Sequence, residues 1–237
     1  MASIAPQAQG MDRFGDADAF IITQEFAAIE LCGIEAKNRY RAYQAGADES
    51  ITSTSGLPNT MYINEESKTL ERICCGPNRA LTLIVHKGDS KEGPEMLRFH
   101  KPFHLQGCIC CRPSMTISDS AGKQVGRVED PFVCCAMNQK VFDDQDKLKY
   151  NVEGSICQIG LCCPCCGDVK FDVTDAQGGS PGVIKKLFGG CSELCLGTNK
   201  FKVTFPKNAT EPDKSLLLGA TMLVDLQYFE AKEKKQG

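Results

Sequence analysis

The sequence lacks the short motifs by which the common enzyme classes are recognised. It contains no G-x-S-x-G element, no phosphate-binding P-loop, no glycine-rich dinucleotide turn and no cysteine–histidine pair at a familiar spacing. The acidic run at residues 143–146 is interpreted as a solvated turn between two strands and not as a pair of catalytic acids. The sequence therefore favours a protein that is not a metabolic enzyme, and no cofactor is assigned.

A strong charge of either sign is also missing. The 27 basic and 30 acidic side chains leave a formal net charge of −3, whereas proteins that bind nucleic acid through bulk electrostatics carry a basic surface. We therefore expect no nucleic-acid partner. Residues 1–20 have neither the basic nor the apolar segment of a secretory signal, so we expect the protein on the cytosolic side of the cell's membranes.

Cysteine, by contrast, is abundant. There are fifteen, ten of them in adjacent pairs at 74–75, 110–111, 134–135, 162–163 and 165–166. Because cytosolic thiols stay reduced and the count is odd, we expect no disulfides. Adjacent cysteines in an extended strand point to opposite faces, so one of each pair is expected to fill the core as a small hydrophobe.

Long apolar runs are missing except for one, SLLLGATMLVDLQYFE at residues 215–230. A helix over residues 216–229 is about 21 Å long, whereas a bilayer core of about 30 Å needs roughly 20 apolar residues. Asp225 inside the run adds a penalty of about 3 kcal/mol, and the run has no broad polar face for a membrane surface. We therefore predict a helix over residues 215–229 that is buried in protein. Its expected inner residues are Leu216, Leu217, Leu218, Met222, Leu223, Val224, Asp225, Leu226 and Phe229.

The rest of the sequence is predicted to be mainly β. A helix is expected over residues 20–31, after which apolar and polar residues alternate, as in DVKFDVTD and FKVTF. Three segments that begin with a cysteine pair each continue as a strand, an Asp/Gly/Ser turn and a returning strand. A looser hairpin over residues 139–154 and one more over residues 39–66 bring the count to ten to twelve strands. Closing such an antiparallel sheet into a barrel removes its exposed edges. The apolar helix then fills the lumen.

Six segments carry a resemblance to a known family: RICCGPNRALTLIV, CICCRP, CCPCCGDVKFDV, GVIKKLFGG, NKFKVTFP and LLLGATMLVDLQYFE. In order and spacing, over residues 29–230, they resemble the phospholipid scramblase family. The resemblance implies the tubby-like fold, a closed barrel of twelve strands around a hydrophobic C-terminal helix. We expect a disordered tail over residues 1–19, the barrel with its helix over 20–230, and a basic tail over 231–237.

For function, the resemblance implies ATP-independent, bidirectional movement of phospholipids between the leaflets of a membrane. The protein is then expected at the cytosolic face of that membrane, with phospholipids as its partners and partner proteins of a larger assembly as a further class. The alternative is a non-transporting scaffold or adaptor that uses the barrel to bind proteins or lipid headgroups.

Two cysteine clusters are candidate sites. The resemblance implies palmitoylation at Cys108, Cys110 and Cys111, where two acyl chains anchor a protein more stably than one. Buried thiols in a strand are the other interpretation of this cluster. The cluster at residues 162–166 has C-x-x-C spacing, but tetrahedral zinc needs a second half-site. The sequence offers none at that spacing, so structural zinc is not expected.

The resemblance also implies a calcium-binding segment before the last helix, aligned here with LGTNKFKVTFPKN. Gly197, Asn199 and Asn208 stand where family members have acids. Calcium sites use six to eight oxygens with carboxylates among them, and Lys200 and Lys202 add like charge. We therefore expect a degenerate segment, in which Asn199 and Asn208 are the remaining ligand candidates and calcium binding is weak or lost.

Overall fold

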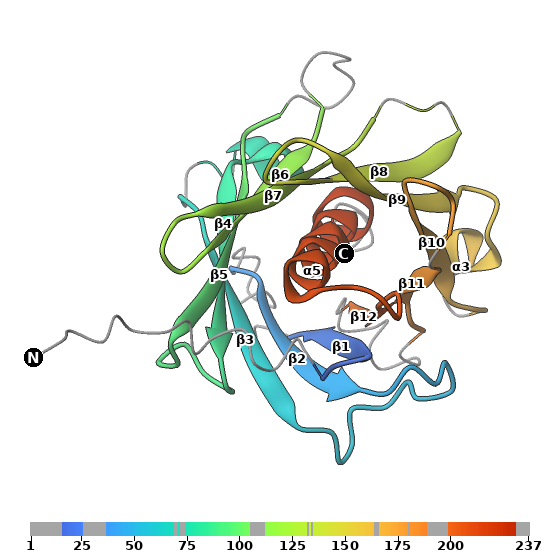
Figure 1. Ribbon diagram of the computed structural model, residues 1–237, viewed down its shortest axis with the longest axis horizontal. Coiled ribbons are helices and arrows are strands. Elements are labelled where there is room, and N and C mark those ends of the chain that lie inside the picture. Colours follow the sequence, from blue (N-terminus) through green and yellow to red (C-terminus); the bar gives the residue numbers. More distant parts are fainter. Residues whose placement is uncertain are drawn as a thin grey trace, which may run out of the picture.

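The chain forms a closed β-barrel with a helix in its lumen (Figure 1). The computed structural model describes residues 16–25, 37–68, 71, 74–104, 112–131, 133, 135–163, 166–179, 181–188 and 199–230. Twelve antiparallel strands follow one another around the ring, each paired with its sequence neighbours, and β1 closes the ring on β12. The predicted mainly-β barrel around a buried C-terminal helix is confirmed.

The elements follow one another as a simple meander. The strands are β1 (Ala19–Gln24), β2 (Arg39–Ala45), β3 (Asn59–Glu66), β4 (Leu81–Lys87), β5 (Glu95–Lys101), β6 (Ser114–Asp119), β7 (Gln124–Glu129), β8 (Ala136–Asp143), β9 (Leu148–Ser155), β10 (Val169–Asp175), β11 (Gly182–Lys186) and β12 (Lys200–Thr204). The helical segments are η2 (Gly76–Asn78), α3 (Ile159–Cys162), α5 (Glu211–Val224) and η3 (Asp225–Phe229), the last being a π-helical continuation of α5.

The helix predicted over residues 20–31 is wrong where the structure describes it, because Ala19–Gln24 form strand β1. A continuous apolar run has no helical or strand period of its own. Here the run is continuous because both faces of β1 are covered. Phe20 and Ile22 face the lumen, whereas Ile21 packs outward against Ile51 of the β2–β3 connection. Residues 26–31 lie outside the described ranges.

The connections alternate between two ends of the barrel because consecutive strands are antiparallel. We call one end the turn end; its connections are residues 46–58, 88–94, 120–123, 144–147, 176–181 and 205–210. We call the other end the cysteine end; its connections are residues 25–38, 67–80, 102–113, 130–135, 156–168 and 187–199. All fifteen cysteines of the sequence fall in this second set. No described strand contains a cysteine, so the expectation that one of each pair fills the core is wrong.

Three hairpins of the turn end are closed in the same way. In each, an aspartate at the end of the first strand accepts hydrogen bonds from the backbone N–H groups two and four residues later, at 2.8–3.0 Å. The residue three positions after each aspartate has φ between 60° and 82°, in the left-handed region that such turns require. The predicted turn at residues 143–146 is confirmed as one of them. The three aspartates are Asp119, Asp143 and Asp175.

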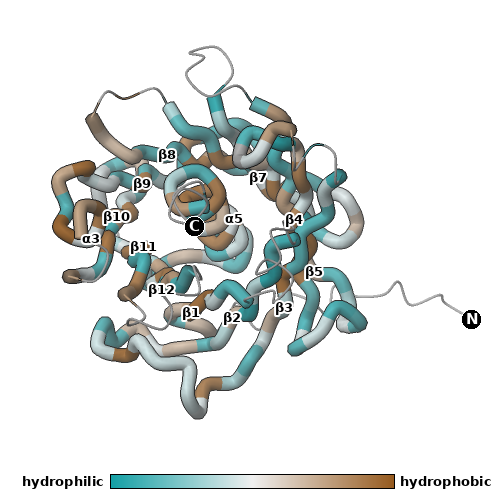
Figure 2. Tube along the Cα trace, turned by 180° about the vertical axis from the view of Figure 1, so that it is seen from behind, coloured by the Kyte–Doolittle hydropathy of each residue, from teal (hydrophilic) through white to brown (hydrophobic). Residues whose placement is uncertain are grey.

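The core lies between the inner face of the barrel and the helix, and Figure 2 shows hydrophobic residues along α5. The helix leans on one side of the wall, over β6, β7 and β8, where two glycines allow close approach. A Cβ on Gly219 of α5 would lie 2.8 Å from Ile117 Cγ1, and a Cβ on Gly126 of β7 would lie 2.9 Å from Leu216 Cδ2. Side chains at either position would push the helix off the wall.

Candidate functional site: the central helix and its polar anchors

The central helix enters the barrel at the turn end and its last turn reaches the cysteine end. Helix α5 and the π-helical η3 together cover the predicted span, residues 215–229, with α5 beginning earlier, at Glu211. Every side chain predicted to face the interior is buried, none more than 5% exposed. These are Leu216, Leu217, Leu218, Met222, Leu223, Val224, Asp225, Leu226 and Phe229.

At the turn end the helix is started by a capping box. The Asp213 N–H donates to Thr210 Oγ1 at 3.4 Å, and the Asp213 carboxylate accepts from the Thr210 N–H at 3.0 Å. Two of the four N–H groups that a helix leaves unpaired are thereby satisfied. Lys149 of β9 approaches Asp213 at 3.2 Å, and Lys214 Nζ donates to the Ala17 carbonyl at 2.9 Å. The start of α5 is thus tied to the wall on two sides.

Near its end the helix changes from α to π geometry, and a buried side chain lies at the transition. The Gln139 amide, oriented so that both of its groups are paired, donates to the Ala220 carbonyl at 3.1 Å and accepts from the Val224 N–H at 3.2 Å. A side chain inserted beside the i→i−4 ladder is a recognised cause of such irregularities. The wider turn that follows covers Asp225–Phe229.

Asp225, the acid inside the apolar run, is the first anchor at the cysteine end. Its Oδ2 accepts from the Tyr40 hydroxyl at 2.7 Å and its Oδ1 accepts from Asn199 Nδ2 at 2.8 Å. Tyr40 lies on β2 and Asn199 directly before β12, so the acid joins the helix to strands on both sides of β1. Burial, helped by Glu230, raises the pKa of Asp225 to about 7, although Tyr40, Lys186 and Asn199 act in the opposite direction.

Arg79 is the second anchor and is almost fully buried. Its Nε and Nη2 bind the two carboxylate oxygens of Glu65 at 2.9 and 2.8 Å, and Nη2 also binds Glu230 Oε1 at 2.7 Å. The Asn38 Nδ2 donates to the same Glu230 oxygen at 3.1 Å. One guanidinium thus links β3, the β3–β4 connection and the residue that follows η3.

The charges of this second anchor stabilise one another. Burial works to raise the pKa of Glu65, but the hydrogen bonds and charge of Arg79 outweigh it and leave that pKa below its usual value. Burial likewise works to lower the pKa of Arg79, and the two glutamates outweigh it, so the pKa is raised. A forked guanidinium between two carboxylates is the geometry that makes a buried ion pair tolerable.

A third anchor holds the last turn to the β7–β8 connection. The Asp130 carboxylate accepts from Arg112 Nη2 at 2.7 Å and from the Tyr228 hydroxyl at 3.4 Å, and it also contacts the Gln227 amide. Burial of the Tyr228 side chain and the charge of Asp130 raise the pKa of that hydroxyl. The three anchors together surround the end of the helix.

Of these anchors, only two residues, Asp225 and Asn199, were singled out from the sequence. The acid in an apolar run signals that a buried partner must exist, but nothing in the run says which of the polar residues far upstream supplies it. Tyr40 and Glu65 lie near the ends of strands β2 and β3, and Arg79 lies in the β3–β4 connection. No local sequence pattern marks any of the three. The only sequence signal that points to them is indirect: the buried acid Asp225 requires polar partners elsewhere in the chain.

The two candidate calcium ligands lie beyond opposite ends of strand β12. Asn199 stands before β12 at the cysteine end, buried, with its amide committed to Asp225. Asn208 is exposed in the β12–α5 connection at the turn end. A five-residue strand rises about 16 Å at roughly 3.3 Å per residue, so the two side chains do not meet at a common point. Gly197 lies outside the described ranges.

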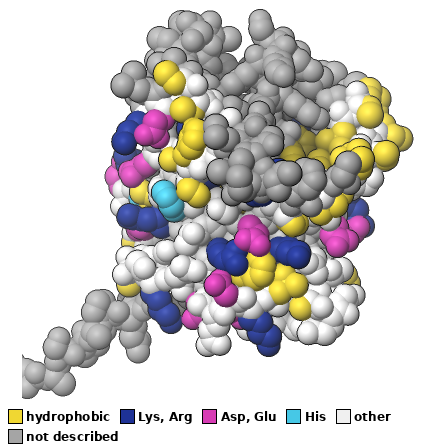
Figure 3. Space-filling view, turned by 90° about the horizontal axis from the view of Figure 1, so that it is seen from above, with side chains coloured by type: hydrophobic (Ala, Val, Ile, Leu, Met, Phe, Trp, Pro, Cys, Tyr) yellow, Lys and Arg dark blue, Asp and Glu magenta, His cyan; other side chains and the backbone are white. Residues whose placement is uncertain are grey.

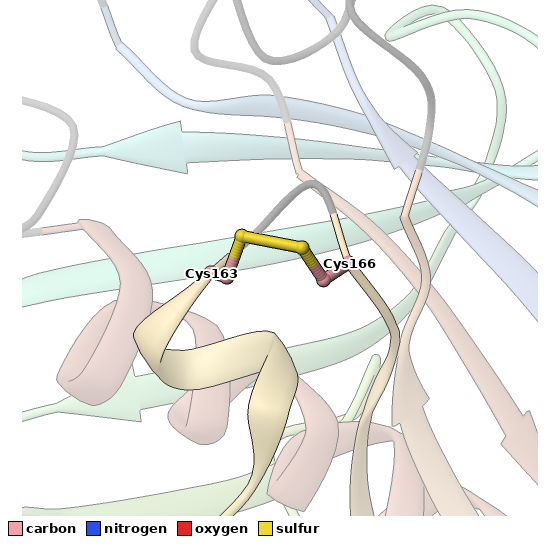
Figure 4. Close-up of a disulfide and its surroundings, with 2 residues drawn as sticks. All are labelled: Cys163 and Cys166. Carbon is pink, nitrogen blue, oxygen red and sulfur yellow. A yellow bond between two sulfur atoms is a disulfide. The ribbon is translucent and has the colours of Figure 1, made fainter.

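One of the two cysteine clusters predicted as candidate sites is described in part by the structure, and it holds a disulfide. Cys108, Cys110 and Cys111 lie outside the described ranges. Cys163 and Cys166 form a disulfide after α3, with Cα atoms 5.4 Å apart (Figure 4), so the expectation of no disulfides is wrong for this pair. Across the C-x-x-C spacing the chain turns back, with the Cys166 N–H donating to the Cys163 carbonyl at 2.9 Å, so that the two sulfur atoms can bond.

The described residues contain no group of three or more His, Cys, Asp or Glu side chains arranged to hold a metal ion. Among the helices that the structure describes, none has the length and apolarity needed to cross a membrane.

Comparison with known proteins gives the same family along the whole chain. The sequence model of the family described as Scramblase matches residues 1–231. Phospholipid scramblase 1 of Homo sapiens is 25% identical over 236 residues, which cover 96% of this chain and 69% of that protein. Phospholipid scramblase 2 of Bos taurus is 26% identical over 226 residues, covering 93% and 71%. Phospholipid scramblase family member 5 of Homo sapiens is 26% identical over 231 residues, covering 93% and 77%. No solved structure matches the chain.

Proposed function

Because the chain belongs to the scramblase family, we propose that it moves phospholipids between the two leaflets of a membrane, in both directions and without ATP. The observation that carries the proposal is the family match over residues 1–231, together with relatives named as phospholipid scramblases that align over most of the chain. Such a protein is a lipid transporter and not a metabolic enzyme. We place it at the cytosolic face of its membrane, with calcium not required.

In this proposal the central helix stays inside the barrel while lipids move. Withdrawing it would separate Asp225 from Tyr40 and Asn199, and Glu230 from Arg79. Breaking one buried charge pair by removing a partner costs about 3–5 kcal/mol, and the apolar contacts of the helix would be lost as well. A retained helix supports lipid movement along the surface of the protein over insertion of the helix into the bilayer.

Reconstitution tests lipid movement directly. The full chain is incorporated into vesicles that carry a phospholipid with a dithionite-sensitive fluorophore, without ATP and with calcium chelated. We expect dithionite to bleach part of the inner-leaflet pool as well as the outer one. The Leu223→Arg variant, in which a buried unpaired charge should prevent folding, is the matched negative control. Bleaching that stops at the outer-leaflet pool would reject transport under these conditions.

A second candidate, a non-transporting scaffold or adaptor, is supported by the same three anchors. They fix the helix to strands and connections around the barrel, as suits a rigid binding module. A scaffold is expected to bind vesicles or partner proteins while the fluorophore of the inner leaflet stays protected. The reconstitution therefore separates the two candidates by itself.

Attachment to the membrane through Cys108, Cys110 and Cys111 remains part of the proposal. Thioester-linked acyl chains on two of the three would give stable anchoring. Fractionation of cells before and after hydroxylamine tests this, because hydroxylamine cleaves thioesters. The triple Cys→Ser variant should fractionate as the hydroxylamine-treated protein does. A membrane fraction unchanged by both treatments would exclude thioacylation as the anchor.

A further inference from the structure

The exposed large apolar side chains of the described residues all lie at the cysteine end. They stand on the connections after β5, β7, β9 and β11, and the most exposed is Ile159, at 72%. Within the described ranges, the turn end and the outer wall of the barrel carry none. The set is Phe103, Val133, Ile156, Ile159 and Phe188.

The densest part of this set lies beside α3. Ile156 and Ile159 stand at the start of α3, and the exposed thiol of Cys162 ends it. Phe188 belongs to the same region, because its N–H donates to Asp168 Oδ1 at 2.8 Å. Hydrophobic side chains gather at the upper right of Figure 3, on the side of the barrel where Figure 1 shows α3.

Polar contacts hold the backbone beneath these side chains in place. The Gln158 amide donates to the carbonyls of Ser155 and Lys170 at 2.9 and 2.8 Å, and it accepts from the Lys170 N–H at 2.7 Å. The backbone of Gly160 in α3 is packed so closely on Gly167 that a Cβ there would lie 2.4 Å from the Gly167 oxygen. The apolar tips are therefore presented outward by a fixed support.

We propose that the described apolar side chains of the cysteine end, Phe103, Val133, Ile156, Ile159 and Phe188, form a membrane-docking surface and enter the boundary between the headgroups and the acyl chains of a phospholipid bilayer. The inference rests on the proposed action on membrane phospholipids and adds which end faces the bilayer. A bilayer fits this surface better than a partner protein does. Among the described residues these apolar side chains stand on four separate connections around one rim and form no continuous apolar core of the kind that a protein interface buries. Shallow entry of apolar side chains is how proteins bind at the membrane interface.

Charged side chains limit the depth of docking and oppose the reverse orientation. Lys170 and Asp172, paired at 2.8 Å on the outer wall next to these tips, would remain in the headgroup layer. At the turn end, exposed acids such as Asp144 and Asp146 would reach the bilayer first. Burying charged carboxylates is strongly unfavourable, and of these two only Asp146 has a partner among the described residues, Arg127, so the turn end faces away.

A single introduced tryptophan tests the orientation, because the chain contains none of its own. Ile159→Trp and Gln177→Trp place one indole at an exposed position of each end. With vesicles of equal parts phosphatidylcholine and phosphatidylserine, the emission of Ile159→Trp should move to shorter wavelength. Lipids brominated near the headgroup end of the acyl chain should quench it. Gln177→Trp should keep its spectrum. An unchanged Ile159→Trp spectrum, or equal shifts in both variants, would overturn the proposal.

A matched pair of charge substitutions measures the contribution to binding. Ile159→Asp and Gln177→Asp add the same charge at opposite ends, and their melting curves check that both fold. In the docked protein the Ile159 side chain would be buried in the bilayer, so its loss in Ile159→Asp should weaken vesicle partitioning about tenfold. Gln177→Asp should bind as the wild type does. Equal partitioning of both variants would contradict docking through α3.

Lipid movement by the wild type is measured in the same vesicles, so that the docking proposal and the transport proposal can be rejected independently. A shifted Ile159→Trp spectrum without lipid movement would keep the docking surface and reject the proposed transport. Lipid movement with an unchanged Ile159→Trp spectrum would keep transport and reject the docking surface.

Discussion

At the turn end, three hairpins are closed by aspartates that bind backbone N–H groups two and four residues later in the chain. At the cysteine end, the helix is held by partners that lie 151 residues away for Arg79 and Glu230 and 185 residues away for Tyr40 and Asp225. The turn end is thus built by local contacts that form as each hairpin forms. The cysteine end is complete only when the whole ring has closed around the helix.

The difference assigns separate tasks to the two ends. Short hairpins closed by carboxylates need few buried charges and present polar residues to the solvent. Long connections with exposed apolar tips need a strong internal support, which the buried anchors around Asp225, Arg79 and Asp130 supply. The end that we propose to meet the membrane is also the end at which buried side chains distant in sequence hold the helix.

The largest effect is expected from removing the guanidinium of the second anchor. Arg79→Ala leaves Glu65 and Glu230 buried without their main partner, and breaking such a pair is expected to lower the free energy of unfolding by about 3–5 kcal/mol. Guanidinium titration followed by circular dichroism measures this. The matched control is Arg98→Ala, because the exposed Arg98 pairs with Glu95 at the turn end of β5, and such pairs contribute about 0–1 kcal/mol. Equal losses in the two variants would show that the ends do not differ in this respect.

A pH-dependent effect is expected from Asp225. Its pKa in the folded protein is about 7, against about 3.9 in an unfolded chain, so the folded state binds the proton more tightly. The contribution of Asp225 to the free energy of unfolding should therefore be full below about pH 4, fall as the pH rises towards 7, and level off above that. The fall between pH 5 and 8 should be about 3 kcal/mol. Asp225→Asn has no such acid, so its stability should lack this fall.

The comparison of Asp225→Asn with the wild type removes the other titrations of the same end. The pKa of His104 is lowered to about 4, first by burial and then by Lys101 and Arg112. Its contribution therefore grows as the pH rises towards the unfolded value of about 6.5, in the opposite direction to that of Asp225. Both proteins share it. Denaturant midpoints measured from pH 5 to 8 should diverge between the two proteins; parallel curves would mean that Asp225 does not titrate in this range.

A smaller effect is expected from the cap of the helix at the turn end. Thr210→Ala removes the hydroxyl that accepts from Asp213, and loss of an N-cap costs about 1 kcal/mol. Thr210→Ser keeps the hydroxyl and is the control. Thermal unfolding should show a modest fall for the first variant and almost none for the second. A loss as large as that of Arg79→Ala would mean that both ends hold the helix equally.

The same contrast explains what the sequence could predict. The turn at residues 143–146 was recognised because the aspartate and the N–H groups it binds are within five residues of one another. The helix was recognised because an apolar run with no polar face, too short for a membrane, leaves only a buried position. The β1 strand was misread, since cover from the β2–β3 connection removes the alternation by which a strand is recognised.

The contacts that could not be predicted from the sequence are those between residues that are distant in the chain. In the sequence Tyr40 cannot be told from any other aromatic residue of a strand, nor Arg79 from any other basic residue of a connection. Their roles appear only when closure of β1 on β12 places them around Asp225 and Glu230. From the sequence, Asp225 indicates that a buried polar partner exists but not which residue it is. The resemblance that makes Asn199 and Asn208 candidate calcium ligands likewise does not show that they lie beyond opposite ends of β12.

The smallest effect is expected from calcium. Asn199 already donates to Asp225, whereas Asn208 lies beyond the other end of β12, so the segment offers no two amides at one point. The weakest calcium modules bind at about 10⁻⁴–10⁻³ M, and we expect this segment to be no better. The melting temperature should therefore be the same in chelator and in micromolar calcium, and calorimetric titration should be flat. Asn208→Asp restores one carboxylate at the turn end and should not create a site, because Asn199 lies beyond the other end of β12. Saturable micromolar binding that is lost in Asn199→Ala would contradict this expectation and would mean that Asn199 can leave Asp225 to serve the ion.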